Sequence, residues 1–327
     1  MRKQWVWSAL LGMVVMLTLV GWSLHQDRSP SLVFSDQPPV SPQQAAQSTP
    51  IAPTVNAERL MADLATFSFE RFTEADRSRA RQELRQSLEM AGWTVQTQAF
   101  EHGINLYAER MGTDPTAGTI LLAAHYDTVE RSPGADDNAT AVATVLEAAR
   151  LFSQQPTPRT LQLALFDLEE TGLEGSTAFA EEVAQDDLQG VIVMDMLGYA
   201  CQEAGCQTYP PLPITPPTDR GNFLAVIGDR GNPALIDSFN PSEPADLPPV
   251  LTLAVPTFGQ LTPDMMRSDH VPFWRRGIGA VLVTDTANFR NPYYHQPDDT
   301  VETIDQAFFV GAAQRVVNAA TTLLTPF

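Results

Sequence analysis

The stretch "AAHYDTVERSPGADDNATAV", residues 123–142, is the most informative part of the sequence for the fold and for the functional site. It continues a short apolar run and contains His125, Asp127 and the adjacent acids Asp136 and Asp137. Charged side chains are costly to bury, so a concentration of them beside a buried segment needs a compensating partner. The question is which other groups the fold brings to this point.

Four apolar runs are each followed by residues that can bind a metal ion. The runs and the residues that follow them are 119–124 with His125 and Asp127, 161–166 with Glu169 and Glu170, 191–194 with Asp195, and 280–284 with His295 after a loop. Near-continuous apolar strands separated by helices indicate a parallel sheet that is covered on both faces. Because open α/β sheets bind ligands at the carboxyl ends of parallel strands, the four groups are expected to converge.

The predicted fold is therefore a three-layer α/β/α domain with a mixed, centrally parallel sheet, spanning residues 56–327. Apolar periodicity predicts helices over 73–93, 140–152, 175–184 and 305–324, and alternation predicts paired strands over 94–101 and 104–110. Residues 201–249 are rich in Pro and irregular, and we interpret them as an insertion or lid within this domain.

Converging carboxylates repel one another unless a cation lies among them. His together with Asp and Glu, without Cys, suits a hydrolytic zinc centre. If His125, Asp136, Glu170, Asp195 and His295 bind two divalent ions, the three carboxylates and a bridging hydroxide balance the charge of the ions. Bound metal lowers the pKa of water to roughly 7, which makes that hydroxide a nucleophile at neutral pH.

The N-terminal segment 1–25 predicts a membrane anchor or a signal sequence. Residues 5–24 carry no charge and follow Arg2 and Lys3; about 20 apolar residues can span a bilayer, and the basic flank favours a cytoplasmic N-terminus. An uncleaved transmembrane helix is favoured over a cleaved signal. Residues 26–55, rich in Pro, Ser and Gln, read as a disordered linker.

Either interpretation of that segment places the domain outside the cytoplasm, anchored to the membrane in a periplasmic or extracellular position, or secreted after cleavage. A disulfide between Cys201 and Cys206 is compatible with an oxidising compartment but is not established by the sequence. The net charge of −19 argues against nucleic acid as a partner, because phosphate binding requires a basic face.

Six motifs occur in order along the chain: "HYD", "GADDNATA", "EETGLEGS", "MDMLGY", "SDHVPF" and "YYHQPDDT". Over roughly residues 56–327, the chain resembles the di-zinc aminopeptidases of metallopeptidase family 28. The resemblance implies two zinc ions and release of N-terminal residues from peptides or proteins. It also implies the metal ligands. His125 and Asp195 would each bind one of the ions, Glu170 and His295 would complete the set, and Asp136 would bridge both ions.

The same resemblance implies an unusual cis peptide bond after the bridging residue, between Asp136 and Asp137. Asp137 and Asn138 either take part in the metal site or only shape the turn and cap the following helix. We favour the structural role for Asn138.

Three further side chains receive roles from the resemblance. Glu169 is the implied general base, which takes a proton from water and returns it to the leaving amine. Asp127 is expected to accept the ring N–H of His125, and Tyr294 to donate to the oxyanion. Asp269 either belongs to the surroundings of the site or caps the helix that follows it.

Two other classes of protein share sequence features with this chain. Glutaminyl-peptide cyclotransferases, single-zinc acyltransferases that form N-terminal pyroglutamate, have this fold and resemble "HYD", "MDMLG" and "DHVPFWRRG", whereas "GADDNA" and "EETGLEGS" favour the two-metal hydrolase. Receptors that have lost their metal ligands are the third class, and no ligand is missing in this chain.

Overall fold

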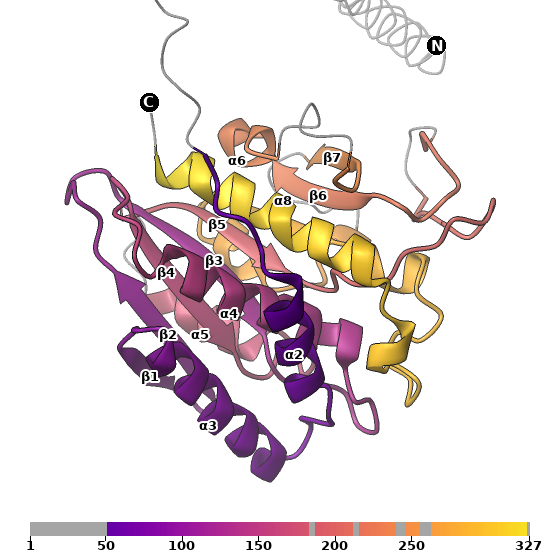
Figure 1. The fold of residues 1–327 in the computed structure, drawn as a ribbon, viewed down its shortest axis with the longest axis horizontal. Coiled ribbons are helices and arrows are strands. Elements are labelled where there is room, and N and C mark those ends of the chain that lie inside the picture. Colours follow the sequence, from indigo (N-terminus) through magenta and orange to yellow (C-terminus); the bar gives the residue numbers. More distant parts are fainter. Residues whose placement is uncertain (1–50, 183–186, 212–215, 240–245, 256–262, 326–327) are drawn as a thin grey trace, which may run out of the picture. The chain divides into compact units, whose positions relative to one another are not determined.

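Eight strands form one mixed sheet in the order β1-β2-β4-β3-β5-β8-β6-β7. Figure 1 shows the sheet with β1 and β2 at one edge and β6 and β7 at the other. The computed structural model describes residues 51–182, 187–211, 216–239, 246–255 and 263–325. The strands are β1 (Val95–Ala99), β2 (Ile104–Arg110), β3 (Thr119–His125), β4 (Thr160–Phe166), β5 (Leu188–Met194), β6 (Leu224–Asp229), β7 (Val250–Val255) and β8 (Ala280–Thr284).

The centre of the sheet is parallel. β3 pairs in parallel with both β4 and β5, and β5 pairs in parallel with β8. Towards the edges, β2 runs antiparallel to β4 and β1, and β6 runs antiparallel to β8. The four apolar runs of the sequence thus became β3, β4, β5 and β8, and the prediction of a mixed, centrally parallel sheet is confirmed.

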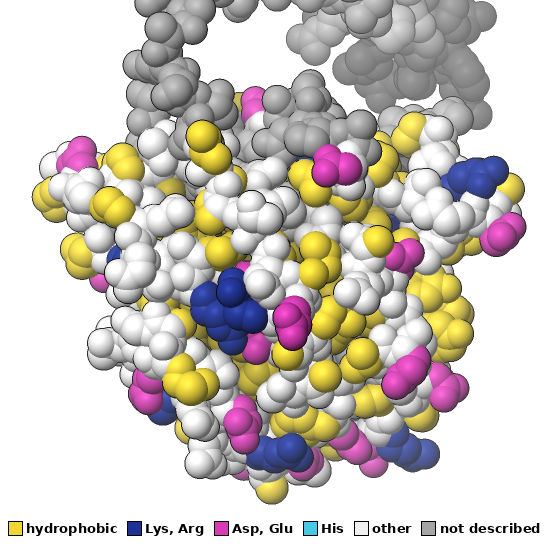
Figure 2. All heavy atoms as spheres, in the orientation of Figure 1, with side chains coloured by type: hydrophobic (Ala, Val, Ile, Leu, Met, Phe, Trp, Pro, Cys, Tyr) yellow, Lys and Arg dark blue, Asp and Glu magenta, His cyan; other side chains and the backbone are white. Residues whose placement is uncertain are grey.

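Helices cover both faces of this sheet. They are α2 (Ala57–Phe67), α3 (Glu74–Met90), α4 (Ala141–Phe152), α5 (Glu174–Glu182), α6 (Pro233–Asp237), α7 (His270–Arg275) and α8 (Gln306–Leu324). In Figure 1, α2, α3, α4 and α8 lie in front of the sheet and α5 lies behind it. The space-filling view of the same face shows Asp and Glu side chains scattered among a few Arg side chains (Figure 2).

Each face of the sheet has its own hydrophobic core. Side chains of a strand point alternately to opposite faces. Leu122 of β3 accordingly belongs to the core that includes residues of α2, α3, α4 and α8, while Leu121 belongs to the core that includes Phe179 of α5 and Phe273 of α7. This two-sided burial explains why β3 is almost wholly apolar up to His125.

The interpretation of residues 201–249 as an irregular insertion was wrong in part. β6 and α6 lie within this segment, and β7 follows it directly. β6 and β7 pair with each other and β6 pairs with β8, so the segment extends the same sheet. Cys201 and Cys206 form a disulfide at the beginning of this segment.

The predicted membrane-spanning helix within residues 1–25 lies outside the described residues, as does most of the predicted linker. Among the helices of the described part, none is both long and apolar enough to cross a bilayer.

Candidate metal centre and its pocket

His125 and Asp127 stand at the carboxyl end of β3. His125 is 1% exposed, and its Nδ1 lies 3.4 Å from Asp127 Oδ1. The Asp127 carboxylate also accepts hydrogen bonds from the backbone N–H groups of Glu169 (3.0 Å) and Glu170 (3.2 Å). One carboxylate therefore contacts the imidazole and also fixes the loop that follows β4.

The carboxylate that lies between the two histidines belongs to Asp137. Its Oδ1 is 3.4 Å from His125 Nε2 and its Oδ2 is 3.1 Å from His295 Nε2. Asp137 sits in η1 (Ala135–Thr140), the short helical turn that leads into α4. Because its two oxygens face different imidazoles, this carboxylate is placed to serve two cations at once.

The assignment of Asp136 as the bridging residue was therefore wrong. Its buried carboxylate accepts hydrogen bonds from Gly198 N (2.8 Å) and Asn291 Nδ2 (2.7 Å). The backbone N–H groups of Asp136 and Asp137 both donate to the Asp299 carboxylate, at 2.9 and 3.1 Å. With the backbone held in this way, the two neighbouring side chains diverge, and only that of Asp137 reaches the histidines.

The expected position of the cis peptide bond was also wrong by one residue, since it lies between Asp137 and Asn138. Asn138 shapes this turn, but not by capping α4. Its Nδ2 donates to Met194 O (3.1 Å) and its Oδ1 accepts from Met196 N (3.0 Å). These bonds fix the backbone on both sides of Asp195.

Two adjacent groups of potential ligand atoms result. In each group the atoms lie within 4.8 Å of one another, and the groups are His125 with Glu169 and Asp195, and Asp137 with Glu170 and His295. His125 Nε2 is 3.6 Å from Asp195 Oδ1, and His295 Nε2 is 3.1 Å from Glu170 Oε2. The fold thus brings together every expected ligand except Asp136.

The carboxylates of this cluster are buried and close together, so the cluster favours bound protons or cations. Burial raises the pKa of Glu169 well above its ordinary range and that of Glu170 to about 7. Burial opposes protonation of His125 and His295, yet nearby carboxylates outweigh it and raise both pKa values, that of His295 to about 10. Burial likewise opposes ionisation of Asp137, but the two histidines lower its pKa. Bound divalent ions would supply the positive charge that these carboxylates favour.

The donor atoms fit such ions. Within the described part of the chain, Glu170 Oε1 is buried and makes no hydrogen bond. Buried polar atoms are rarely left unpaired unless something outside the protein binds them. Two imidazoles with several carboxylates and no thiolate are ligands that zinc accepts.

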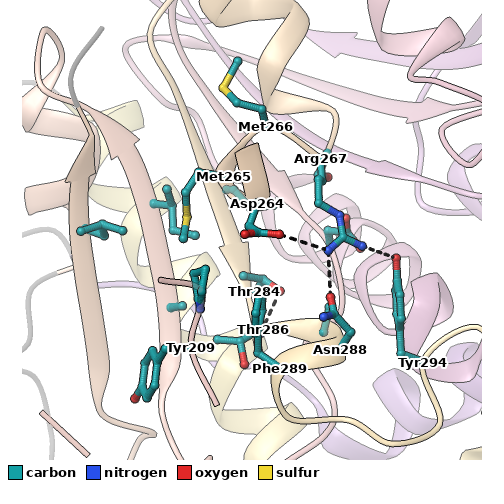
Figure 3. Close-up of a pocket in the computed structure, with 18 of the residues that line it drawn as sticks. Tyr209, Asp264, Met265, Met266, Arg267, Thr284, Thr286, Asn288, Phe289 and Tyr294 are labelled. Carbon is teal, nitrogen blue, oxygen red and sulfur yellow. Dashed lines mark hydrogen bonds and ion pairs between the residues drawn. The ribbon is translucent and has the colours of Figure 1, made fainter. Parts of the chain in front are cut away.

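A cavity of about 500 Å³ opens beside these ligands. Tyr294 lines it, with its ring stacked on the imidazole of His295 at 3.7 Å between centroids and 22° between planes. Arg267, which no sequence pattern had singled out, donates from Nη2 to the Tyr294 hydroxyl at 3.0 Å (Figure 3). The apolar and aromatic part of the lining includes Tyr209, Phe223, Ile227, Leu251, Leu253, Met265, Leu282 and Phe289.

Asp269 stands at the N-terminus of α7, but its side chain makes no capping hydrogen bond. Both carboxylate oxygens are buried without a hydrogen bond among the described residues. Burial raises the pKa of this group to about 7, and its charge in turn raises the pKa of Glu169. The capping interpretation was therefore wrong, and Asp269 belongs to the surroundings of the site.

Arg71 is a buried supporting residue that sequence reasoning missed. Its guanidinium donates to the backbone carbonyls of Tyr126 (2.6 Å), Pro133 (2.9 Å) and Gly134 (3.0 Å). These bonds hold the loop between β3 and η1, which carries Asp127. The residue stands alone in "SFERF", outside all motifs and periodic segments, so the sequence contained no signal for it.

The chain belongs to Peptidase family M28, whose sequence profile matches residues 105–320. Among curated proteins, Uncharacterized protein YfbL of Escherichia coli is 33% identical over 207 residues, covering 57% of this chain and 61% of that protein. Aminopeptidase YwaD of Bacillus subtilis is 27% identical over 199 residues, covering 57% of this chain and 37% of that protein. The chain thus spans less than two thirds of these relatives.

Solved structures share the fold. The LapA aminopeptidase of Legionella pneumophila superposes with a TM-score of 0.66 at 17% identity, covering 87% of this chain and 79% of that one. The glutaminyl cyclase of Bacteroides thetaiotaomicron superposes with a TM-score of 0.61 at 16% identity, covering 82% and 98%. At these identities the likeness concerns the fold alone.

Proposed function

We propose that this protein is a metal-dependent aminopeptidase that binds two zinc ions. The observation that carries the proposal is the Asp137 carboxylate between His125 and His295, with Asp195 beside the first imidazole and Glu170 beside the second. Membership of a peptidase family and the likeness to a curated aminopeptidase support the same reaction class.

Bound zinc would supply Lewis-acid polarisation of the scissile carbonyl and would lower the pKa of water to roughly 7. The chain provides the proton transfers. Glu169, buried close to His125 and Asp195, takes a proton from the attacking water and gives it to the leaving amine. Asp127 holds the backbone of Glu169 in place, and the hydroxyl of Tyr294 donates to the developing oxyanion.

The acidic character of the site favours an aminopeptidase over a carboxypeptidase. Carboxylates at the end of the cavity can hold the α-amino group of a peptide. The substrate expected is therefore the N-terminus of a peptide or protein.

The test uses the purified full chain, with zinc content measured alongside release of amino acids from aminoacyl-anilides. Chelation should abolish activity and zinc should restore it. Glu169→Gln should keep both zinc ions and lose about 10²- to 10⁴-fold in kcat. Glu174→Gln is the matched control, because Glu174 lies on the following helix and pairs with the exposed His102. Normal cleavage by Glu169→Gln would refute the assignment of the base.

The same preparation tests the cyclotransferase alternative. One zinc ion per chain, together with pyroglutamate formation from a peptide with N-terminal Gln, would replace the aminopeptidase proposal. The two groups of ligand atoms support the two-ion enzyme.

We also propose that the peptidase domain works outside the cytoplasm, attached to the membrane through residues 1–25. The Cys201–Cys206 disulfide supports an oxidising compartment. Fractionation of cells that express the full chain tests this: the protein should sediment with membranes and carry no thiol that alkylates before reduction. Recovery in the cytosolic fraction with two free thiols would contradict it.

A further inference from the structure

We propose that Arg267 is a positioning residue for the hydroxyl group of Tyr294, directing the phenolic proton into the substrate cavity. This inference rests on the proposed function, in which that hydroxyl donates to the oxyanion. It assigns a role to a residue that lies outside the metal ligands and the general base.

The Arg267 side chain is 45% exposed, and its guanidinium contacts three polar side chains. Its Nη1 donates to Asn288 Oδ1 at 2.9 Å and its Nη2 donates to the Tyr294 hydroxyl at 3.0 Å. The Asp264 carboxylate lies 3.9 Å from Nη1. Figure 3 shows the guanidinium in the middle of this group, with all four side chains at the cavity. A planar guanidinium with two directed bonds has little freedom to turn.

The ring of Tyr294 is fixed from its other side. It stacks on the imidazole of His295, and Arg267 Cζ lies 5.9 Å from the centroid of the phenol ring. The position of the hydroxyl oxygen is therefore set by the stacking together with the hydrogen bond from Arg267. Only the rotation of the O–H bond about the C–O axis is left to be determined.

The chemistry of the guanidinium determines that rotation. Arginine donates hydrogen bonds and accepts none, so the Tyr294 oxygen must use a lone pair towards Arg267 and must turn its proton elsewhere. Within the described residues, the hydroxyl has no acceptor for that proton. The proton is consequently available to an oxygen atom of a bound substrate, and the adjacent positive charge strengthens it as a donor.

A double-mutant cycle on the zinc-loaded full chain tests the inference. Tyr294→Phe should lower kcat by about 10²-fold, the usual effect of removing one oxyanion donor. Arg267→Gln should lower kcat by about tenfold with KM changed less than about twofold, because substrate binding does not depend on the phenolic proton. In the Tyr294→Phe background, Arg267→Gln should cost less than about twofold. Arg267→Lys, which keeps a charged donor, should recover part of the loss.

A second measurement does not depend on activity. In protein labelled with ¹³Cζ-tyrosine, the Tyr294 resonance is identified by its loss in Tyr294→Phe, and Arg267→Gln should shift it. Arg79→Gln is the control, since Arg79 lies on α3 against Phe69, and it should alter neither the resonance nor kcat.

The outcomes separate the two proposals. If Arg267→Gln lowers kcat equally in both backgrounds, or raises KM instead, Arg267 acts on the substrate directly and the inference fails. If Arg267→Gln has no effect while Tyr294→Phe does, the inference fails and the proposed function stands. If Tyr294→Phe has no effect, the role of Tyr294 in the proposed function is wrong.

Discussion

Two adjacent carboxylates, Asp136 and Asp137, perform different tasks in this structure. That of Asp137 faces both imidazoles of the candidate metal centre, and that of Asp136 accepts hydrogen bonds from the backbone of Gly198 and the side chain of Asn291. Both are buried, so burial does not distinguish the ligand from its neighbour. The difference lies only in the direction that the fixed turn gives to each side chain.

Replacement of each acid by its amide separates the two tasks. Asp137→Asn should lose zinc, with fewer than two ions per chain, and should lose at least about 10²-fold in activity, because the amide cannot bridge two cations. Asp136→Asn should keep both ions and lose about 1–3 kcal/mol of unfolding free energy, since one buried acceptor becomes a donor. Metal analysis and chemical denaturation measure these effects. Retention of both ions by Asp137→Asn with their loss from Asp136→Asn would reverse the assignment.

At the scale of the elements, the sequence predicted the centre of the sheet and missed its far edge. β3, β4, β5 and β8 are continuous apolar runs because helices cover both of their faces. β7 is only partly buried and alternates, and β6 is embedded among prolines, so their signals were weak. The strand ends pointed to four of the expected ligands, His125, Glu170, Asp195 and His295. The resemblance gave Asp136 in place of Asp137, because a local turn with an irregular backbone determines which of the two side chains faces the histidines.

The turn itself gives a prediction at Gly134. This residue has φ +60°, and an added Cβ would lie 2.3 Å from Asp137 O and 2.4 Å from Thr128 Cγ2. Gly134→Ala should therefore displace the loop that carries Asp137, reduce zinc binding and cost about 2–5 kcal/mol of unfolding free energy. Gly92→Ala is the control, since Gly92 has φ +87° with nothing within 4 Å of an added Cβ, and it should cost only about 1–2 kcal/mol. Equal losses in both variants would show that crowding at Gly134 is unimportant.

At the scale of the whole molecule, the ligands of one site come from positions 170 residues apart, between His125 and His295. Bound ions would therefore link β3, β4, β5 and the loop after β8. Any ligand that binds only the folded chain stabilises it, by about 4 kcal/mol at a thousandfold excess over Kd. Zinc should accordingly raise the melting temperature of the full domain.

Zinc uptake should also release protons. His295, with a pKa of about 10, and Glu170, with a pKa of about 7, hold protons near neutral pH in the metal-free protein, and metal ligands must be deprotonated. Below these pKa values protons compete with zinc, so the apparent zinc affinity should fall as the pH is lowered and rise as it is increased. Calorimetric titration in two buffers of different ionisation enthalpy counts the protons released. Identical heats in both buffers would contradict this prediction.

The contacts of the Asp127 carboxylate have a consequence for which parts of the site can change independently. It touches one imidazole and holds the peptide N–H groups of two consecutive glutamates, Glu169 and Glu170. A substitution there would disturb cation binding and acid–base chemistry in the same event. Substitutions in the apolar wall of the cavity leave these three contacts of Asp127 unchanged, so the shape of the cavity can change without altering the arrangement of His125, Glu169 and Glu170.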